Sequence, residues 1–561
     1  MKRLEKLTTR RGEALTGTPW TAYPRPQMKR EQWWNLNGEW EFGVHFDRKI
    51  RVPFCPEAEL SGIGEHFPEG SPLRYRKRVT LPSGGGRLLL HFGGADQRAQ
   101  VYVNGKLAGE HEGGYAAFTL DVTDLWQEGE NEIKVICRDD LTDRSFPYGK
   151  QTLNRGGMWY TPVSGIWQTV WMERVPETYI KKLRIVNRGA SVTIDTGLSL
   201  PGTLSVAGLG QFPLTDGKVT ITPENPRFWS PEDPYLYEFT VEAGEDRVES
   251  YFALRTLEIK TVGGYPRLCL NGKPYFFHGL LDQGYWPDGL LTPAAPECYA
   301  DDILAMKALG FNTLRKHIKV EPEEFYYQCD KLGMVVFQDM VNNGRYSFFR
   351  DTALPTLGVQ KLPDRGLNRD GKTRRVFLQS MECTVRQLEN HPCILCWTIF
   401  NEGWGQFCAD DAYEALRKID DTRWIDTTSG WFRRRKSDVD SRHVYFRRVK
   451  LRGSGKKPLV LSEFGGKTWR AEGHVFNPDK TYGYGACPDQ AALGQAVEAL
   501  YREEILPCVK EGLCAAIYTQ VSDVEDEING LLTYDRKLEK LAPERMLPVA
   551  QALRQAMEEE V

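Results

Sequence analysis

The sequence predicts a multidomain protein in which β-sandwiches precede a C-terminal α/β barrel. Three observations lead to this fold class. The chain has 561 residues, enough for about three or four domains of ordinary size. Short alternating runs with Gly, Asn and Asp turns fill the first 257 residues, and after them apolar strand-like runs alternate with longer helical patterns. Aromatic residues make up 11% of the chain, which suits β-sandwich cores.

The first 257 residues divide into two predicted sandwiches. Residues 1–175 contain runs such as RYRKRVTL, RLLLHFGG and NEIKVIC, which predict a jelly-roll-type β-sandwich. Within it, Asn104-Gly105 predicts a hairpin turn, because both residues tolerate positive φ. Residues 176–257 continue with shorter strands over about 80 residues, the length of one immunoglobulin-like sandwich.

Residues 258–561 are predicted to form a (β/α)8 TIM barrel, because eight strands in about 300 residues are typical of that fold. A doubly wound sheet is the alternative, but LLDQGYW after the first strand is not its Gly-rich phosphate turn. The predicted strands are 275–282, 311–317, 334–340, 393–401, 424–428, 443–446, 458–463 and 514–522; the predicted helices are 297–310, 321–333, 373–390, 409–421, 490–512 and 544–560.

Composition argues against several classes of protein. Lys plus Arg number 73 against 76 acidic residues, a net charge of −3, so nucleic acid is not an expected partner. The N-terminus lacks the apolar core of a secretory signal and no apolar run reaches 18 residues, so we expect a cytoplasmic protein without membrane spans. The 12 Cys are scattered and indicate reduced thiols. Cys393 and Cys396 are not expected to share a metal, since residues three apart in a strand face opposite sides.

The candidate reactive groups stand at the ends of the predicted barrel strands, where TIM barrels place their active sites. Glu402 and Glu463 each follow an apolar run and precede glycines, and a glutamate ending a buried strand is costly unless it is paired or used. On strands four and seven they would face each other across the barrel mouth. Two such carboxylates suit glycoside hydrolysis, which needs an acid and a second carboxylate at the anomeric carbon. The alternative is that either glutamate is a structural residue paired with Arg315.

Motifs along nearly the whole chain also resemble glycoside hydrolase family 2, the group of β-galactosidases, β-glucuronidases and β-mannosidases. They include VYVNGKLAGEHEGGYAAFTLDVTD (101–124), YTPVSGIWQTVWME (160–173), FWSPEDPYLYEFTVE (228–242), GFNTLRKH (310–317), NHPCILCWTIFNEGWG (390–405) and KPLVLSEFGG (457–466). The resemblance implies three domains in the order given above. It also implies a retaining exo-β-glycosidase that needs no organic cofactor and acts on a glycoside or oligosaccharide. The sequence leaves open whether the protein forms a homo-oligomer.

By that resemblance Glu402 would be the general acid/base and Glu463 the nucleophile. Asn401 would bind the sugar 2-hydroxyl, and Tyr445 would keep Glu463 ionised unless it is only a barrel-layer aromatic. The resemblance implies positioning or pocket-shaping roles for Arg315, His317, Asp282, Asp339 and Trp404.

The substrate is less sharply indicated, with a β-galactoside or a related pentoside favoured. Glu527 and Asn529 stand where glucuronidases carry an Asn-x-Lys that grips the sugar carboxylate, which argues against a glucuronide. Lys316 and Lys319 could meet an anionic sugar, so a galacturonide remains an alternative substrate. An arabinosidase or a galactofuranosidase is a further alternative. A non-catalytic carbohydrate-binding protein and a metal-dependent hydrolase are the competing classes. The second is disfavoured because nine His form no His-x-His.

Overall fold

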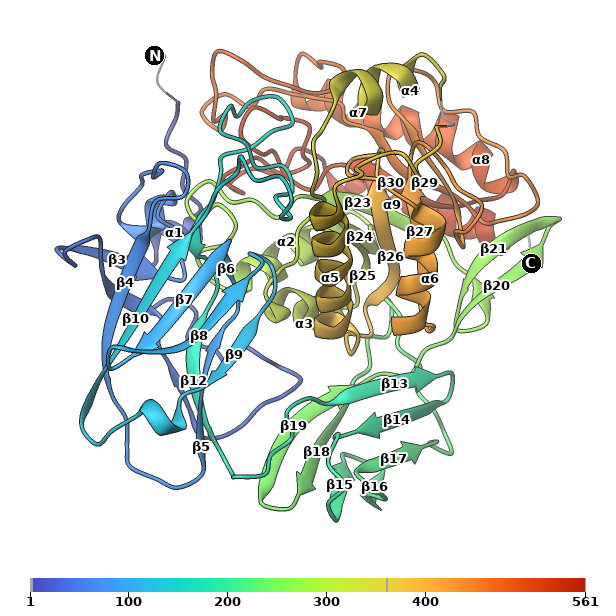
Figure 1. Cartoon of the computed structure of the whole chain (residues 1–561). Helices are drawn as coiled ribbons and strands as arrows, with labels where there is room; N and C mark the ends of the chain where they lie inside the picture. The colour runs from blue at the N-terminus through green and yellow to red at the C-terminus, as the bar shows by residue number, and fades with distance from the viewer. Residues whose placement is uncertain (1–3, 360–361, 560–561) are drawn as a thin grey trace.

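In the computed structural model, which describes residues 4–359 and 362–559, one sandwich module lies to the left of a barrel and a second lies below it (Figure 1). The predicted fold class is confirmed. The N-terminal module pairs a four-stranded sheet with a six-stranded one. In order across the sheets, the first has β1 (Trp33–Asn35), β12 (Val170–Val175), β5 (Arg87–Phe92) and β9 (Phe118–Asp121); the second has β3 (Arg48–Val52), β2 (Gly38–Phe42), β4 (Leu73–Thr80), β10 (Glu130–Arg138), β7 (Arg98–Val103) and β8 (Lys106–Glu112).

Alternation explains this sandwich, because inward residues of β10 are buried and outward ones are not. The buried side chains include Trp40, Tyr75 and Ile133. The predicted hairpin turn joins β7 to β8, with Asn104 at φ 50° and Gly105 at φ 78°. A short ladder between β6 (Ala95–Asp96) and β11 (Gly165–Ile166) completes the module.

The second module is smaller and also has two sheets. One sheet has β13 (Arg184–Arg188), β14 (Ser191–Asp195) and β17 (Lys218–Ile221); the other has β16 (Gly210–Pro213), β15 (Gly202–Val206), β18 (Tyr237–Ala243) and β19 (Asp246–Phe252). All neighbouring strands in both sheets are antiparallel. Its core contains Ile194, Leu204 and Phe239 and is separate from the cores of the other modules.

The barrel is a sheet of eight parallel strands. Their bonded order is β27 (Trp424–Ser429), β26 (Ile394–Asn401), β25 (Val335–Asp339), β24 (Thr313–Lys316), β23 (Phe277–Asp282), β30 (Leu513–Thr519), β29 (Leu459–Gly465) and β28 (Asp440–Val444). The two end strands, β27 and β28, contact each other and are bridged by Ser429 Oγ and Ser441 Oγ, 3.2 Å apart. The barrel is therefore nearly closed.

Helices cover the outside of this barrel. They are α2 (Glu297–Ala308), α3 (Glu323–Leu332), α5 (Gly371–Leu388), α6 (Ala409–Ile419), α7 (Gln490–Leu500), α8 (Leu506–Lys510) and α9 (Pro543–Glu558), so each predicted helix is present. The connections after β27 and β28 are loops, because WFRRRKSDVD and YFRRVKLRGSGKK carry charges and glycines without a helical apolar period.

One element was missed by the sequence analysis. Residues 257–274 form a three-stranded sheet of β20 (Leu257–Val262), β21 (Tyr265–Leu270) and β22 (Lys273–Pro274) before the first barrel strand. Buried Arg267 on β21 donates to the carbonyl oxygens of Val509 and Leu513, at 2.8 and 3.2 Å. This sheet therefore packs at the N-terminal end of β30, opposite the predicted site.

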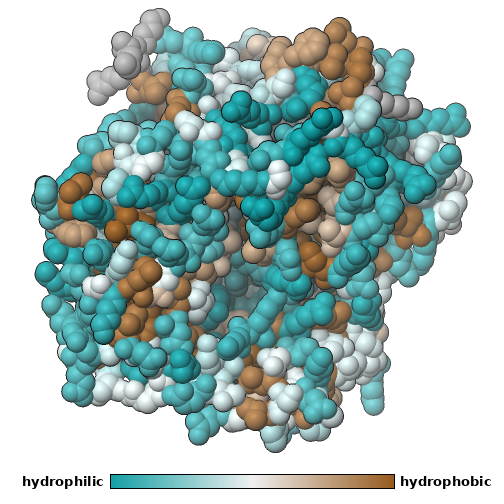
Figure 2. All heavy atoms as spheres, in the orientation of Figure 1, coloured by the Kyte–Doolittle hydropathy of each residue, from teal (hydrophilic) through white to brown (hydrophobic). Residues whose placement is uncertain are grey.

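On the face shown in Figure 2, hydrophobic residues form separate patches among hydrophilic ones. The largest lies at the upper edge, in the region where Figure 1 places α4 (Leu354–Thr356). On either side of α4 in the sequence, Phe348, Phe349 and Leu357 are 68%, 66% and 78% exposed. Within the described residues, no helix combines the length and apolar character needed to cross a bilayer. All 12 Cys are free thiols.

Candidate active site

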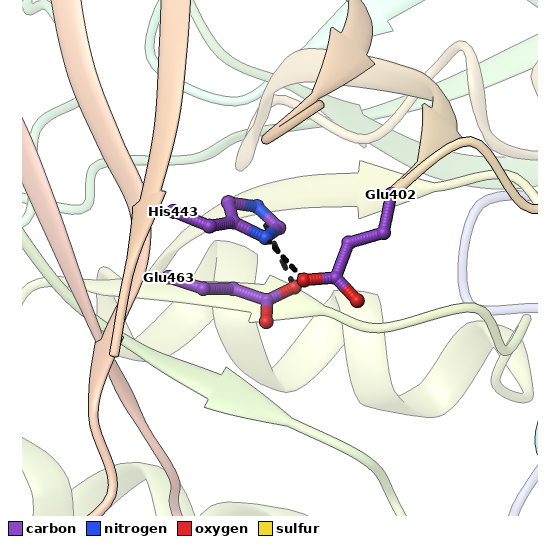
Figure 3. Close-up of side chains that lie close together, drawn as sticks. All are labelled: Glu402, His443 and Glu463. Atoms are coloured by element: carbon purple, nitrogen blue, oxygen red, sulfur yellow. Dashed lines mark hydrogen bonds and ion pairs between the residues drawn. The ribbon is translucent and has the colours of Figure 1, made fainter. Parts of the chain in front are cut away.

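The two predicted carboxylates meet at the C-terminal end of the barrel (Figure 3). Glu402 directly follows β26, and Glu463 lies near the end of β29. One oxygen of each carboxylate and one ring nitrogen of His443 all lie within 4.8 Å of one another. Glu402 is the more accessible, because its side chain is 15% exposed against 6% for Glu463.

The backbone turns sharply at Glu402. Its φ is +50°, in the left-handed region that costs a non-glycine residue free energy and that clusters at functional sites. Gly403 follows at φ +78°, and a Cβ there would lie 2.4 Å from the Phe432 ring, so only glycine fits. The Glu402 amide donates to Ser429 O at 2.9 Å, which fixes the turn against β27.

Glu463 is held by two groups that favour its ionised form. Tyr445 Oη donates to Oε2 at 2.6 Å, and Arg315 Nη1 donates to Oε1 at 3.1 Å. Burial alone would raise the pKa of Glu463, but neighbouring His443 and Arg315, with the Tyr445 hydrogen bond, lower it to about 2. At neutral pH Glu463 is therefore a carboxylate.

The pKa of Glu402 is shifted in the opposite direction, upward. Burial raises the pKa of Glu402, the hydrogen bond from His443 opposes this, and the charge of Glu463 adds to the increase. Two close carboxyl groups with pKa values pushed apart are the pattern of an acid and a nucleophile in one site.

Arg315 connects most of the predicted site residues. Its Nη2 donates to Asn401 Oδ1 at 2.9 Å and its Nε to Asp339 Oδ1 at 3.0 Å, in addition to the contact with Glu463. Asp339 Oδ2 lies 2.7 Å from Nδ1 of His317. Because burial lowers the pKa of His317 to about 4, this ring is neutral at pH 7. Asn401 has its amide oxygen engaged, which leaves its NH2 group to bind a substrate hydroxyl.

Among the described residues, the side chains of Asp282 and Trp404 make no hydrogen bond to the carboxylate pair. Asp282 accepts from Lys316 Nζ at 2.6 Å and from the Gly284 amide at 2.9 Å. Trp404 is buried and stacks on Trp159 with ring centroids 5.3 Å apart. Trp404 thus forms an aromatic wall two residues beyond Glu402.

The lysines that kept an anionic sugar open in the sequence are engaged elsewhere. Lys316 is fully buried and also contacts Glu321 at 2.8 Å. Lys319 Nζ donates to Glu321 and to the carbonyl oxygens of Gly284 and Leu291. Neither is left to meet a substrate carboxylate.

Sequence reasoning missed three residues of this site. His443, two positions before Tyr445, has Nδ1 2.8 Å from Glu402 Oε1 and Nε2 3.7 Å from Glu463 Oε1 (Figure 3). Two residues with this spacing share one face of an extended strand, which is the signal that could have revealed His443. Lys150 and Trp159 come from the N-terminal module, and no periodicity in their loop indicates that they reach the barrel.

The segment that carries Lys150 and Trp159, residues 142–161, is bound along the barrel mouth. The Tyr148 amide donates to Asn342 O at 3.1 Å, beyond β25. Further along, Arg155 pairs with Asp526 at 2.8 Å, and Tyr160 Oη donates to Glu527 Oε2 at 2.6 Å, beyond β30. The N-terminal module therefore forms one wall of the site.

Lys150 is notable because it is a buried lysine at the barrel mouth. It is 6% exposed, and Nζ lies 5.5 Å from the centroid of the Tyr160 ring. No hydrogen bond or ion pair of this ammonium is found among the described residues. Burial dominates the pKa values of Glu402 and His317, and the charge of Lys150 acts on both. Lys150 therefore directs a positive charge toward the two predicted residues.

The convergence of Glu402, His443 and Glu463 also raises the question of a metal ion. Arg315 Nη1 lies 3.1 Å from Glu463 Oε1 and 3.3 Å from His443 Nε2, so a fixed positive charge already contacts two of the three candidate ligand groups. We interpret the cluster as an acid–base centre.

Comparisons with known proteins place this architecture in a family. "Glycosyl hydrolases family 2, TIM barrel domain" matches residues 265–542. "Glycosyl hydrolase 2 galactose-binding domain-like" matches residues 49–148, and "Glycosyl hydrolases family 2" matches residues 183–255. The three models occur in one order and cover most of the chain. The chain belongs to glycosyl hydrolase family 2.

Its relatives carry different activities. A β-galactosidase of Thermoanaerobacter pseudethanolicus is 25% identical over 420 residues, which are 69% of this chain and 52% of that protein. A β-glucuronidase of Felis catus is 26% identical over 68% of this chain and 65% of its own length. The chain thus spans about half to two thirds of these relatives.

Solved structures support the same fold. A β-D-glucuronidase of Dictyoglomus thermophilum superposes with a TM-score of 0.72 at 18% identity, covering 96% of this chain and 98% of that one. A GH2 β-galacturonidase of Eisenbergiella tayi, bound to galacturonate, superposes at 0.66 with 18% identity, covering 95% and 99%. At these identities the likeness is one of fold.

Proposed function

We propose that this protein is a retaining β-glycosidase, with Glu463 as the nucleophile and Glu402 as the general acid/base. The observation that carries the proposal is the pair itself: two carboxyl groups with oxygens within 4.8 Å and pKa values shifted in opposite directions. Retaining glycosidases hold their carboxyl groups about 5–5.5 Å apart, whereas inverting enzymes leave about 6.5–9.5 Å for a water molecule.

The mechanism follows from these contacts. Glu463 attacks the anomeric carbon as Glu402 gives its proton to the leaving oxygen, and a glycosyl-enzyme ester forms. Glu402, now a carboxylate, then takes a proton from water as the water attacks the anomeric carbon and releases Glu463. Arg315 and Tyr445 would hold Glu463 in line for attack. The free NH2 of Asn401 would donate to a sugar hydroxyl beside the reacting carbon, a contact that tightens in the transition state.

The experiment is hydrolysis of a panel of nitrophenyl glycosides by the wild type and by Glu463→Ala and Glu402→Ala. Each variant should lose most turnover. Azide should restore Glu463→Ala with inverted product, and should restore Glu402→Ala with retained product for a good leaving group. Full activity of either variant would refute the assignment. A panel without any hydrolysis would favour the carbohydrate-binding alternative, which calorimetry with oligosaccharides then tests. EDTA should leave turnover intact.

For the sugar, a β-galactoside is the first candidate, in keeping with the β-galactosidases among the relatives. Lys150 favours a second candidate, a sugar that carries a carboxylate. A buried ammonium without a counter-ion is unfavourable, and a substrate carboxylate would compensate it. We therefore include β-glucuronides and β-galacturonides as candidate substrates. Glu527, which argued against a uronide, has Oε2 bonded to Tyr160 Oη and Oε1 to Asn529 Nδ2, so neither oxygen is without a partner.

Lys150→Gln separates the two candidates. If the substrate is a uronide, this variant should lose about 13- to 160-fold in kcat/KM, since a hydrogen bond to a charged group contributes about 1.5–3 kcal/mol. Lys150→Arg should retain part of the activity. Lys372→Gln, which removes an exposed lysine paired with Asp143, is the matched control. Equal losses on galactoside and uronide would count against Lys150 as a carboxylate receptor.

A further inference from the structure

His443 has contacts on both of its ring nitrogens. The ring lies at the end of β28 and its side chain is fully buried. Nδ1 lies 2.8 Å from Glu402 Oε1. On the other side, Nε2 lies 3.0 Å from Ser429 Oγ and 3.3 Å from Arg315 Nη1. The imidazole thus connects the proposed acid/base to residues inside the barrel.

These contacts determine the tautomer. A guanidinium N–H can only donate, so Nε2 must accept where it faces Arg315. A proton on Nε2 would also point at a positive charge. The hydrogen-bond network therefore places a ring proton on Nδ1, and this N–H donates to Glu402.

The ring cannot easily leave this position. Behind it, the hydroxyl groups of Ser429, Ser441 and Ser462 lie 2.5–3.2 Å from one another on β27, β28 and β29. This cluster lies at the seam between the two end strands of the barrel. A Cβ at residue 430 would be 2.6 Å from Nδ1, so Gly430 leaves room for the ring and for nothing more. Burial and this support fix the Nδ1–H direction.

We propose that His443 is a positioning residue for Glu402: it binds Oε1 through Nδ1–H and thereby leaves Oε2 to exchange the proton with the substrate. This inference rests on the proposed function. When Glu402 gives its proton to the leaving oxygen, His443 stabilises the carboxylate that results. When Glu402 takes a proton from water, the same N–H keeps it oriented. His443 retains its own proton throughout, so the proton balance involves only Glu402, the leaving group and water.

The pH dependence of Glu402 depends on all charged or titratable groups that face it. They come from β28, β29, the N-terminal segment and the barrel loops: His443, Tyr445, Glu463, Lys150, Tyr346, Tyr482 and Tyr484. Only His443 donates a hydrogen bond to Glu402 among the described residues. Its loss should therefore change the titration of Glu402 in a predictable direction, upward, because an N–H donor stabilises the carboxylate.

The test is the pH profile of kcat/KM for His443→Leu with glycosides of good and poor leaving groups. Because Glu402 must be protonated to act as the acid, the alkaline limb should move to higher pH by at least half a unit. Loss of kcat/KM should reach about 10- to 100-fold for a methyl or phenyl glycoside and stay below about threefold for a 2,4-dinitrophenyl glycoside, which needs little acid assistance. His443→Asn, whose amide can place an N–H near the position of Nδ1–H, should restore most of both effects.

Two further variants keep the result interpretable. Trp431→Phe alters a ring that packs edge-on against His443, with centroids 5.4 Å apart, and should leave the alkaline limb in place. If His443→Leu does not fold, Ser429→Ala removes one support behind the ring and should shift the limb in the same direction by less. An unmoved limb and a uniform loss across leaving groups would reduce His443 to a packing role. Turnover that survives in Glu463→Ala would instead overturn the proposed function.

Discussion

Tyr445→Phe tests how Glu463 is kept ionised. The phenol donates to Glu463 Oε2 at 2.6 Å, and a hydrogen bond to a charged group contributes about 1.5–3 kcal/mol. At about 1.36 kcal/mol for each pKa unit, its loss should raise the pKa of Glu463 by about 1–2 units, from about 2 to about 3–4. The nucleophile must be a carboxylate, so the acid limb of kcat/KM should move up by the same amount. At pH 7 Glu463 stays ionised in both enzymes, which is why the acid limb carries the test.

The assay measures initial rates immediately after dilution into acidic buffers, before the protein unfolds. Phe preserves the stacking of residue 445 on Tyr484, whose ring centroid is 4.3 Å away. Tyr484→Phe is the matched control, because its hydroxyl lies 3.1 Å from Tyr482 Oη and does not contact Glu463. An acid limb of Tyr445→Phe that coincides with the wild-type limb would refute the reasoning, since the nucleophile would then owe its low pKa to other neighbours.

Two other predictions concern the aromatic wall and acid stability. Trp159→Ala removes the ring stacked on Trp404, and a loss of about 0.5–1.5 kcal/mol predicts a KM about 2- to 13-fold higher for aryl glycosides, with methyl glycosides as the internal control. Equal increases in KM for aryl and methyl glycosides would show that Trp159 does not contact the leaving group. His278 is buried with its pKa lowered to about 3, chiefly by burial. Below about pH 6.5 the unfolded chain binds a proton at His278 and the folded chain does not. The free energy of unfolding should therefore fall by about 1.4 kcal/mol for each pH unit between pH 6 and pH 4. In His278→Phe that contribution should vanish from urea unfolding curves, and parallel pH dependences of the two proteins would contradict it.

The sequence predicts the barrel well because its signals are local. Strands such as Ile394–Asn401 are continuous apolar runs, and helices such as Gly371–Leu388 have a clear period, so both were placed within a few residues. Glu402 and Glu463 were found for the same reason, since each ends such a run. The sheet over residues 257–274 was missed because it continues the β texture of the preceding module.

The contributions of other residues depend on contacts between distant parts of the chain. Lys316 looked available because it follows a barrel strand, yet its ammonium is bonded to Asp282 and Glu321. Lys150 lies in an irregular loop, and nothing in its sequence neighbours shows that its charge acts on Glu402. Whether a lysine is paired is decided by tertiary structure, and one sequence does not record that.

The two modules together make one site, and this has a consequence for specificity. The barrel supplies the carboxyl pair on rigid strand ends, which suits groups that must be held to a fraction of an ångström. The N-terminal module supplies Lys150 and Trp159 on a segment whose own ion pairs, such as Arg155 with Asp526, fix it to the barrel. Chemistry and substrate choice can therefore change separately. We expect a substitution in the 142–161 segment to alter which sugar or leaving group is bound, while Glu402, Glu463 and their supports on the barrel strands stay in place.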